Sequence, residues 1–130
     1  MTIRPALWSL AAATAVLTSG AWAADHVRAL DCKPSGNQQQ LNDCAAQDYR
    51  AADAQLNLRY REVMATLSPE LRDALRSDQR RWLRGRDPAC HQAAKAYAGG
   101  SMRPMIFSSC LEKATRKRTA ELQEWLDRQP

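Results

Sequence analysis

A chain of 130 residues with 19 Lys and Arg against 14 Asp and Glu is long enough for one small domain and too short for two. Its net charge of +5 is mildly basic, well short of that expected for a dedicated nucleic-acid-binding protein. Ala, Leu, Arg, Gln and Glu dominate and long runs of Val, Ile and Thr are missing, so the composition favours helices over strands.

The first 23 residues are typical of a secretory signal peptide. Arg4 supplies a positive charge, residues 6–16 are mostly apolar, and residues 21–23 read Ala-Trp-Ala, the form that signal peptidase cleaves. The apolar run is too short to cross a membrane, which takes about 20 apolar residues. We therefore expect residues 24–130 to be exported as one domain. Because Cys32 lies well past the cleavage point, we expect no lipid anchor there.

Four cysteines follow the signal peptide: Cys32, Cys44, Cys90 and Cys110. An even number of cysteines in a short exported chain indicates two disulfides. The alternative is a metal site with His91 beside Cys90. Zinc sites usually show a close pair such as C-x-x-C, which is missing from this sequence. We therefore predict disulfides, and neither a metal nor another cofactor.

The spacing of apolar residues predicts a first helix over about residues 41–67. It ends at Ser68 and Pro69, where Ser68 can cap the next helix and Pro69 can take its first position. The second helix is predicted to point five residues inward, and Gly85 and Pro88 weaken its far end. Those five residues are Leu71, Ala74, Leu75, Trp82 and Leu83.

A loop at residues 99–101, Gly-Gly-Ser, precedes a third helix that Pro104 can open. The apolar stripe of this helix consists of Phe107, Leu111, Ala114, Leu122, Trp125 and Leu126. The short connection at Ser68 makes the first two helices antiparallel neighbours. The predicted fold is therefore all-α: a helical hairpin plus a third helix, cross-linked by two disulfides.

Such a hairpin gathers the cysteines at one end, because Cys44 lies 24 residues before Ser68 and Cys90 lies 22 after it. Three pairings of four cysteines are possible, and the sequence does not settle which one forms. We favour Cys32 with Cys44 and Cys90 with Cys110, because each pair closes a local segment beside a helix end. Each such loop would contribute roughly 3 kcal/mol to stability.

A polar cluster is predicted where the first two helices pass each other. Its members are Asp53, Asn57, Tyr60, Trp82 and Arg86. The first three share one helical face, and counting from the turn brings the other two alongside them. We favour an ion pair of Asp53 with Arg86 that fixes the register of the hairpin, and a recognition surface is the alternative. A catalytic role is not expected, because no second carboxylate, histidine base or serine elbow accompanies the carboxylate.

Two stretches are basic. On the second helix, arginines recur at residues 72, 76, 80 and 84, but Asp73 and Asp78 can pair with Arg76 and Arg81, which favours a solvated, self-paired face. The third helix offers the preferred site for an anionic envelope polymer. This patch consists of Lys113, Arg116, Lys117 and Arg118. Aromatic residues do not interleave with it, so nucleic acid is not an expected partner.

The residues from 42 to 60 read NDCA...Y..AD..LN..Y, those from 79 to 90 read QR.WL..RD..C, and GGS follows at 99–101. Together with Cys110, Thr115 and Arg118, this order resembles the lysozyme inhibitor LprI-like N-terminal domain family over roughly residues 32–122. The resemblance implies a small exported helical domain with paired cysteines, and a binding protein rather than an enzyme. A lipobox cysteine is missing, so tethering to a membrane is not expected.

The resemblance implies inhibition of a lysozyme-type muramidase in the periplasm. A chemically sensible mechanism blocks the substrate cleft, where glycosidases carry paired carboxylates. Loops present such blocking groups best, so Arg103 or Ser101, beside Gly100, is the expected contact. The alternative function is a structural or accessory envelope protein that binds an anionic polymer through the third helix.

Overall fold

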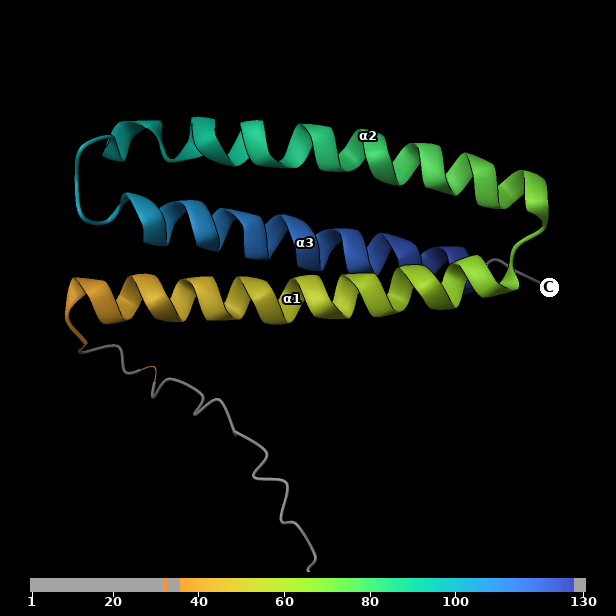
Figure 1. Ribbon diagram of the computed structural model, residues 1–130, viewed down its shortest axis with the longest axis horizontal. Coiled ribbons are helices and arrows are strands. Elements are labelled where there is room, and N and C mark those ends of the chain that lie inside the picture. Colours follow the sequence, from red (N-terminus) through yellow and green to blue (C-terminus); the bar gives the residue numbers. More distant parts are fainter. Residues whose placement is uncertain (1–31, 33–35, 128–130) are drawn as a thin grey trace, which may run out of the picture.

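The computed structural model describes Cys32 and residues 36–127, so the predicted signal peptide lies outside the described residues. Within them the chain forms three long helices and no strand (Figure 1). These are α1 (Gln38–Thr66), α2 (Pro69–Ala93) and α3 (Arg103–Asp127), with a short 3-10 helix, η1 (Lys95–Tyr97), after α2. The prediction of an all-α, three-helix domain is confirmed. No helix in this part of the chain is both long and apolar enough to span a bilayer.

Side-chain caps fix where the first two helices begin. The side chain of Asn37 accepts a hydrogen bond from the backbone of Gln40, whose own side chain accepts one from the backbone of Asn37, so α1 starts three residues before its apolar pattern does. Ser68 caps α2 through a bond from the Leu71 amide, and Pro69 takes the first position, as predicted. The far end of α2 continues through Pro88 to Ala93.

Helix α3 lies between α1 and α2 in the bundle (Figure 1). The expected hairpin is present, because α1 and α2 run in opposite directions on either side of their short turn. However, the helix packed most closely on α1 is α3 and not α2, which the spacing of the apolar residues did not predict. Alanines at Ala45 and Ala52 are buried on α1, and their small side chains let α3 approach closely.

The apolar core lies toward the end of the bundle that carries the α1–α2 turn. Its buried members are Leu56, Val63, Leu67, Leu75 and Leu122. Five half-buried residues pack against them: Tyr60, Met64, Trp82, Trp125 and Leu126. The prediction for α2 was partly wrong, since Leu71, Ala74 and Leu83 are exposed. Helix α2 instead meets the bundle through a narrow stripe, Leu75, Gln79, Trp82, Arg86 and Cys90.

Both predicted disulfides form, Cys32 with Cys44 and Cys90 with Cys110. Cys44 lies near the start of α1, Cys90 near the end of α2 and Cys110 near the start of α3. These helix ends meet at one end of the bundle, opposite the α1–α2 turn (Figure 1). The covalent links and the apolar core therefore hold opposite ends of the same three helices.

Candidate functional site

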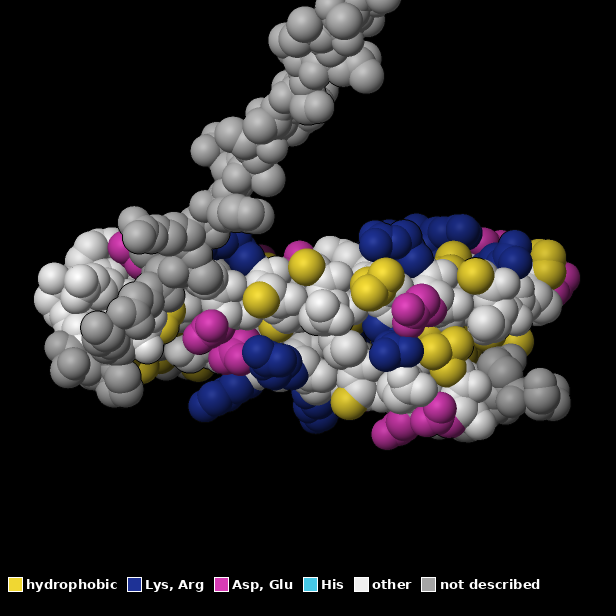
Figure 2. Space-filling model, turned by 90° about the horizontal axis from the view of Figure 1, so that it is seen from below, with side chains coloured by type: hydrophobic (Ala, Val, Ile, Leu, Met, Phe, Trp, Pro, Cys, Tyr) yellow, Lys and Arg dark blue, Asp and Glu magenta, His cyan; other side chains and the backbone are white. Residues whose placement is uncertain are grey.

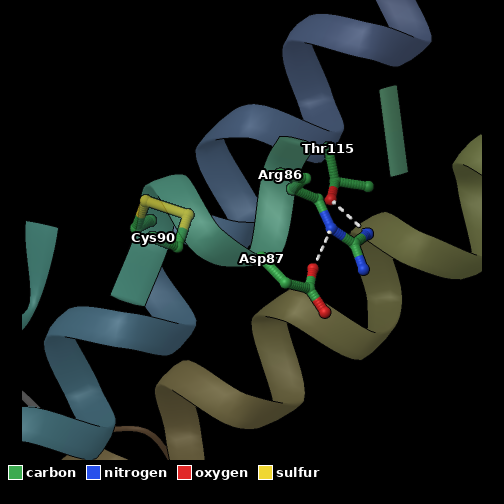
Figure 3. The surroundings of a disulfide bond; sticks show 5 residues. Arg86, Asp87, Cys90 and Thr115 are labelled. Carbon is green, nitrogen blue, oxygen red and sulfur yellow. Dashed lines mark hydrogen bonds and ion pairs between the residues drawn. A yellow bond between two sulfur atoms is a disulfide. The ribbon is translucent and has the colours of Figure 1, made fainter. Parts of the chain in front are cut away.

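Arg86 of α2 joins all three helices. Its Nη1 donates to Asp53 of α1 at 3.3 Å and to Thr115 Oγ1 of α3 at 3.4 Å, and its Nε donates to Asp87 at 2.8 Å. Figure 3 shows Asp87 and Thr115 reaching the guanidinium from different helices, close to the disulfide at Cys90. The side chain of Arg86 is only 7% exposed, so the ion pair with Asp53 is a partly buried contact between α1 and α2.

Two aromatic rings complete the surroundings of this guanidinium. The carbon atom at its centre lies 5.3 Å from the ring centre of Tyr49 and 5.2 Å from that of Trp82, within the range of cation–π attraction. Burial raises the pKa of Tyr49 above its usual value of 10.0, against the opposing effect of the nearby cation. Burial acts to lower the pKa of Arg86, but the hydrogen bond to Asp87 and the neighbouring charges raise it overall.

The polar cluster predicted from sequence is present in part. Asn57 donates to Asp53 at 3.2 Å, and Trp82 lies against Arg86, as the spacing indicated. Tyr60 does not join them and packs against the apolar core instead. Asp87 is a member that the sequence reasoning missed, although it directly follows Arg86. Two carboxylates that hold one guanidinium favour the interpretation of a structural clasp between helices.

Arg118 is a second buried arginine, which corrects its assignment to an exposed basic patch. Its side chain is 8% exposed and donates to Gln79 at 2.9 Å, to Asp78 at 2.6 Å and to Glu121 at 3.1 Å. On α3 it follows Leu111 and Thr115 at helical spacing and precedes Leu122, and all of these are buried. That spacing was the signal in the sequence that Arg118 points into the bundle.

The other basic residues of the two predicted basic stretches are exposed. On α3, Lys113 and Lys117 are exposed, whereas Arg116 pairs with Glu112 at 2.6 Å. On α2, Arg76 pairs with Asp73 and Arg81 with Asp78, so the predicted pairs along this face are present.

A loop of residues 94–102, here called the tip loop, connects α2 to α3 at the disulfide end of the bundle (Figure 1). Its turns are closed by backbone hydrogen bonds that run from Tyr97 to Ala94, from Ala98 to Lys95 and from Gly100 to Tyr97. Gly99 has a φ of 78°, which residues with a side chain rarely adopt. A Cβ at Gly100 would come within 3.3 Å of the Tyr97 carbonyl oxygen, so both glycines suit this tight path.

The base of the tip loop is held from three directions. The disulfide of Cys90 with Cys110 links the two helices that flank it, and the ring of His91 stacks on that of Phe107 with 4.3 Å between their centres. From α1, Asn42 donates to the carbonyl oxygen of Ser101 at 3.0 Å. These contacts fix the loop on the rigid part of the molecule.

The exposed surface of the tip loop combines apolar and polar groups. Tyr97 is 39% exposed and Met102 is 41% exposed, so the loop presents apolar surface. Ser101 is exposed, and Arg103, where α3 begins, is half-buried. Among residues 32 and 36–127, no group of three or more His, Cys, Asp or Glu side chains is placed to hold a metal ion.

Comparisons with known proteins agree with the resemblance in the sequence. The profile of the family described as Lysozyme inhibitor LprI matches residues 31–122, which contain all four cysteines, both buried arginines and the tip loop. An uncharacterized protein of Rhizobium meliloti (strain 1021) is 46% identical over 110 residues, covering 75% of this chain and 79% of that protein. No solved structure matches. The two disulfides and this match indicate an extracytoplasmic protein, and the chain belongs to the LprI family of lysozyme inhibitors.

Proposed function

We propose that this protein inhibits a lysozyme-type muramidase by placing its tip loop in the substrate cleft of the enzyme. The observation that carries the proposal is the construction of that loop in a member of a lysozyme inhibitor family. It is a short exposed segment, closed by its own hydrogen bonds and tied at its base by a disulfide. Loops of this kind on a rigid scaffold commonly carry binding function.

Preorganisation supports this choice of surface. A loop that is already ordered loses little conformational entropy on binding, so more of its contact energy appears as affinity. Tyr97 and Met102 offer exposed apolar area, and tyrosine contributes strongly at protein interfaces because it is large, rigid and amphipathic. The loop therefore has the properties of an inhibitory element without any rearrangement of the bundle.

The charge of the loop also suits the target. Lys95 and Arg103 are basic, and no acidic residue lies between 94 and 103. A retaining or inverting glycosidase carries two carboxyl groups on either side of the scissile bond, of which one acts as an acid and the other as an ionised carboxylate that a cation can approach. Arg103, with Ser101 beside it, is the group expected to reach this carboxylate. Export through a signal peptide cleaved after Ala23 would bring the protein to the periplasm, where it meets such enzymes.

A muramidase assay with rising amounts of the protein tests the proposal. Arg103→Glu reverses the charge next to the loop and is expected to weaken inhibition at least tenfold, because like charges brought together at an interface cost several kcal/mol. Arg84→Glu makes the same change at an exposed site on α2 and serves as the control that keeps inhibition. Absence of inhibition by the unaltered protein at micromolar concentrations ends the proposal for the enzymes assayed. Equal inhibition by both variants places the contact away from the loop.

The alternative, an anionic-polymer site on α3, is less well supported by the geometry. Of the four residues proposed for it, Arg118 is buried and Arg116 is already paired with Glu112. Lys113 and Lys117 are left, one helical turn apart, which is a weak basis for binding a polyanion.

A further inference from the structure

A shallow, open groove of about 520 Å³ lies between α1 and α2, beside the turn that joins them. The α1–α2 turn is at the end of the molecule opposite the tip loop (Figure 1). We call this groove the arginine groove, and its lining residues are Tyr60, Arg61, Met64, Ala65, Arg72 and Arg76. Half of these residues are arginine and none is acidic, so the groove is a site of concentrated positive charge.

The three arginines come from two helices and are held differently. Arg72 donates through Nε to the carbonyl oxygen of Met64 at 2.9 Å, which fixes the start of its guanidinium and leaves the two Nη groups outside that bond. Arg76 forms an ion pair with Asp73. Arg61 is exposed and has no hydrogen bond or ion pair with another described residue. The groove therefore holds more cationic than anionic charge and has donors available for a ligand.

Apolar groups form the rest of the site. Tyr60 and Met64 are half-buried, pack on the apolar core and line the groove. Two large exposed hydrophobic residues lie next to its arginines in the chain: Leu58, which is 44% exposed, stands one turn before Arg61, and Leu71, which is 42% exposed, precedes Arg72. Figure 2 shows Lys and Arg side chains beside hydrophobic ones, with Asp and Glu side chains among them, along one edge of the half of the molecule that carries the α1–α2 turn.

We propose that the arginine groove binds the phosphate headgroup of an anionic phospholipid, with Leu58 and Leu71 against the membrane surface. Guanidinium groups match phosphate oxygens in geometry as well as charge. A basic site with exposed leucines beside it suits a membrane interface, where both charge and apolar contact contribute. A free phosphate ion would make no use of the apolar residues. Because the tip loop lies at the other end of the bundle, lipid binding leaves it accessible.

Co-sedimentation with vesicles tests this inference. The full chain is expressed, and the protein recovered from that expression is used. The two probes are vesicles of phosphatidylcholine alone and vesicles of phosphatidylcholine mixed with phosphatidylglycerol. We expect binding to the mixed vesicles, weakening as salt is added because charges are screened. Ala65→Glu places a carboxylate in the groove and is expected to weaken binding about fivefold or more. Ala120→Glu makes the same change of charge at an exposed alanine of α3 and is the matched control.

Several outcomes would overturn the proposal. Equal losses in the two variants would mean that net charge alone, and not the groove, governs binding. Equal binding to both kinds of vesicle would mean that the phosphate headgroup of an anionic lipid is not recognised. Release of the protein by millimolar inorganic phosphate, at constant ionic strength, would assign the groove to the free ion. Thermal melting of both variants separates loss of binding from loss of fold. Arg61→Gln is a milder change in the groove and is measured in the same way.

Discussion

Replacement of Arg86 by methionine tests whether a buried cation holds α2 on the bundle. The substitution keeps an apolar stem but removes hydrogen bonds to Asp53, Asp87 and Thr115. The carboxylates are 37% and 52% exposed, so water replaces the lost cation and each bond contributes under about 1 kcal/mol. Thr115 is fully buried, and the loss of a partner for its hydroxyl costs about 1–3 kcal/mol. The expected total is about 3 kcal/mol.

Thermal unfolding measures this loss directly. For a domain of this size, about 1 kcal/mol corresponds to a change of roughly 4–8 °C, so Arg86→Met is expected to lower Tm by roughly 12–24 °C. Arg84→Met removes the same charge from an exposed site on the same helix and is expected to change stability by less than about 0.5 kcal/mol. If both variants melt together with the unaltered protein, the clasp at Arg86 does not hold α2. An unchanged melt of Asp53→Ala with loss of lysozyme inhibition would instead identify a recognition surface.

Three further predictions concern stability. Arg118→Gln is expected to lower the free energy of unfolding by about 2 kcal/mol, and Lys117→Gln by less than about 0.5 kcal/mol; urea denaturation showing equal effects would contradict the burial of Arg118. Dithiothreitol is expected to reduce the disulfide of exposed Cys32 before that of buried Cys90, and alkylation with mass spectrometry gives the order. Burial raises the pKa of Tyr49 in the folded state, so this tyrosine loses its proton at a lower pH in the unfolded chain than in the folded protein. The free energy of unfolding is therefore expected to be unaffected by Tyr49 below pH 10 and to fall above it. Unfolding curves of Tyr49→Phe should lack this fall.

Local signals in the sequence were enough to predict most of the fold. Ser68 and Pro69 marked the start of α2 because a cap and an N-terminal proline act within one turn. The disulfide pairing also followed from local reasoning, since each bond closes a segment beside a helix end. What periodicity could not tell is which helices approach most closely, because that depends on side-chain size at an interface formed by residues far apart in the chain.

The misplacement of Leu83 and the misplacement of Arg118 have one physical cause. A reading of helical faces by hydrophobicity counts arginine and glutamine as solvent-facing, so it placed Leu83 inside and Arg118 outside. The stem of arginine is apolar, however, and its guanidinium can be buried when carboxylates and amides bind it. Inside the bundle, Arg118 donates a hydrogen bond to the side-chain oxygen of Gln79 in this way. The arginine groove could not be predicted from the sequence, because only the geometry of the turn brings Arg61 of α1 to the same site as the arginines of α2.

Helix α2 borders both proposed sites, the arginine groove near its start and the tip loop at its end. Long guanidinium side chains at Arg86 and Arg118 connect α2 to the other helices, whereas small buried alanines bring α1 and α3 together. The arginine groove lies between α1 and α2 beside the turn that joins them. At the other end, the disulfide of Cys90 sets the spacing between α2 and α3 and so positions the tip loop.

The distance between the two ends makes the proposed activities separable. Helices α2 and α3 have 25 residues each and are therefore about 38 Å long, which is about the diameter of a small domain. A muramidase bound at the tip loop would not cover the arginine groove, and a bilayer at the groove would not cover the loop. Arg103→Glu should therefore weaken inhibition and spare vesicle binding, whereas Ala65→Glu should weaken vesicle binding and spare inhibition. A variant that lost both while keeping its melting temperature would show that the two ends do not act independently.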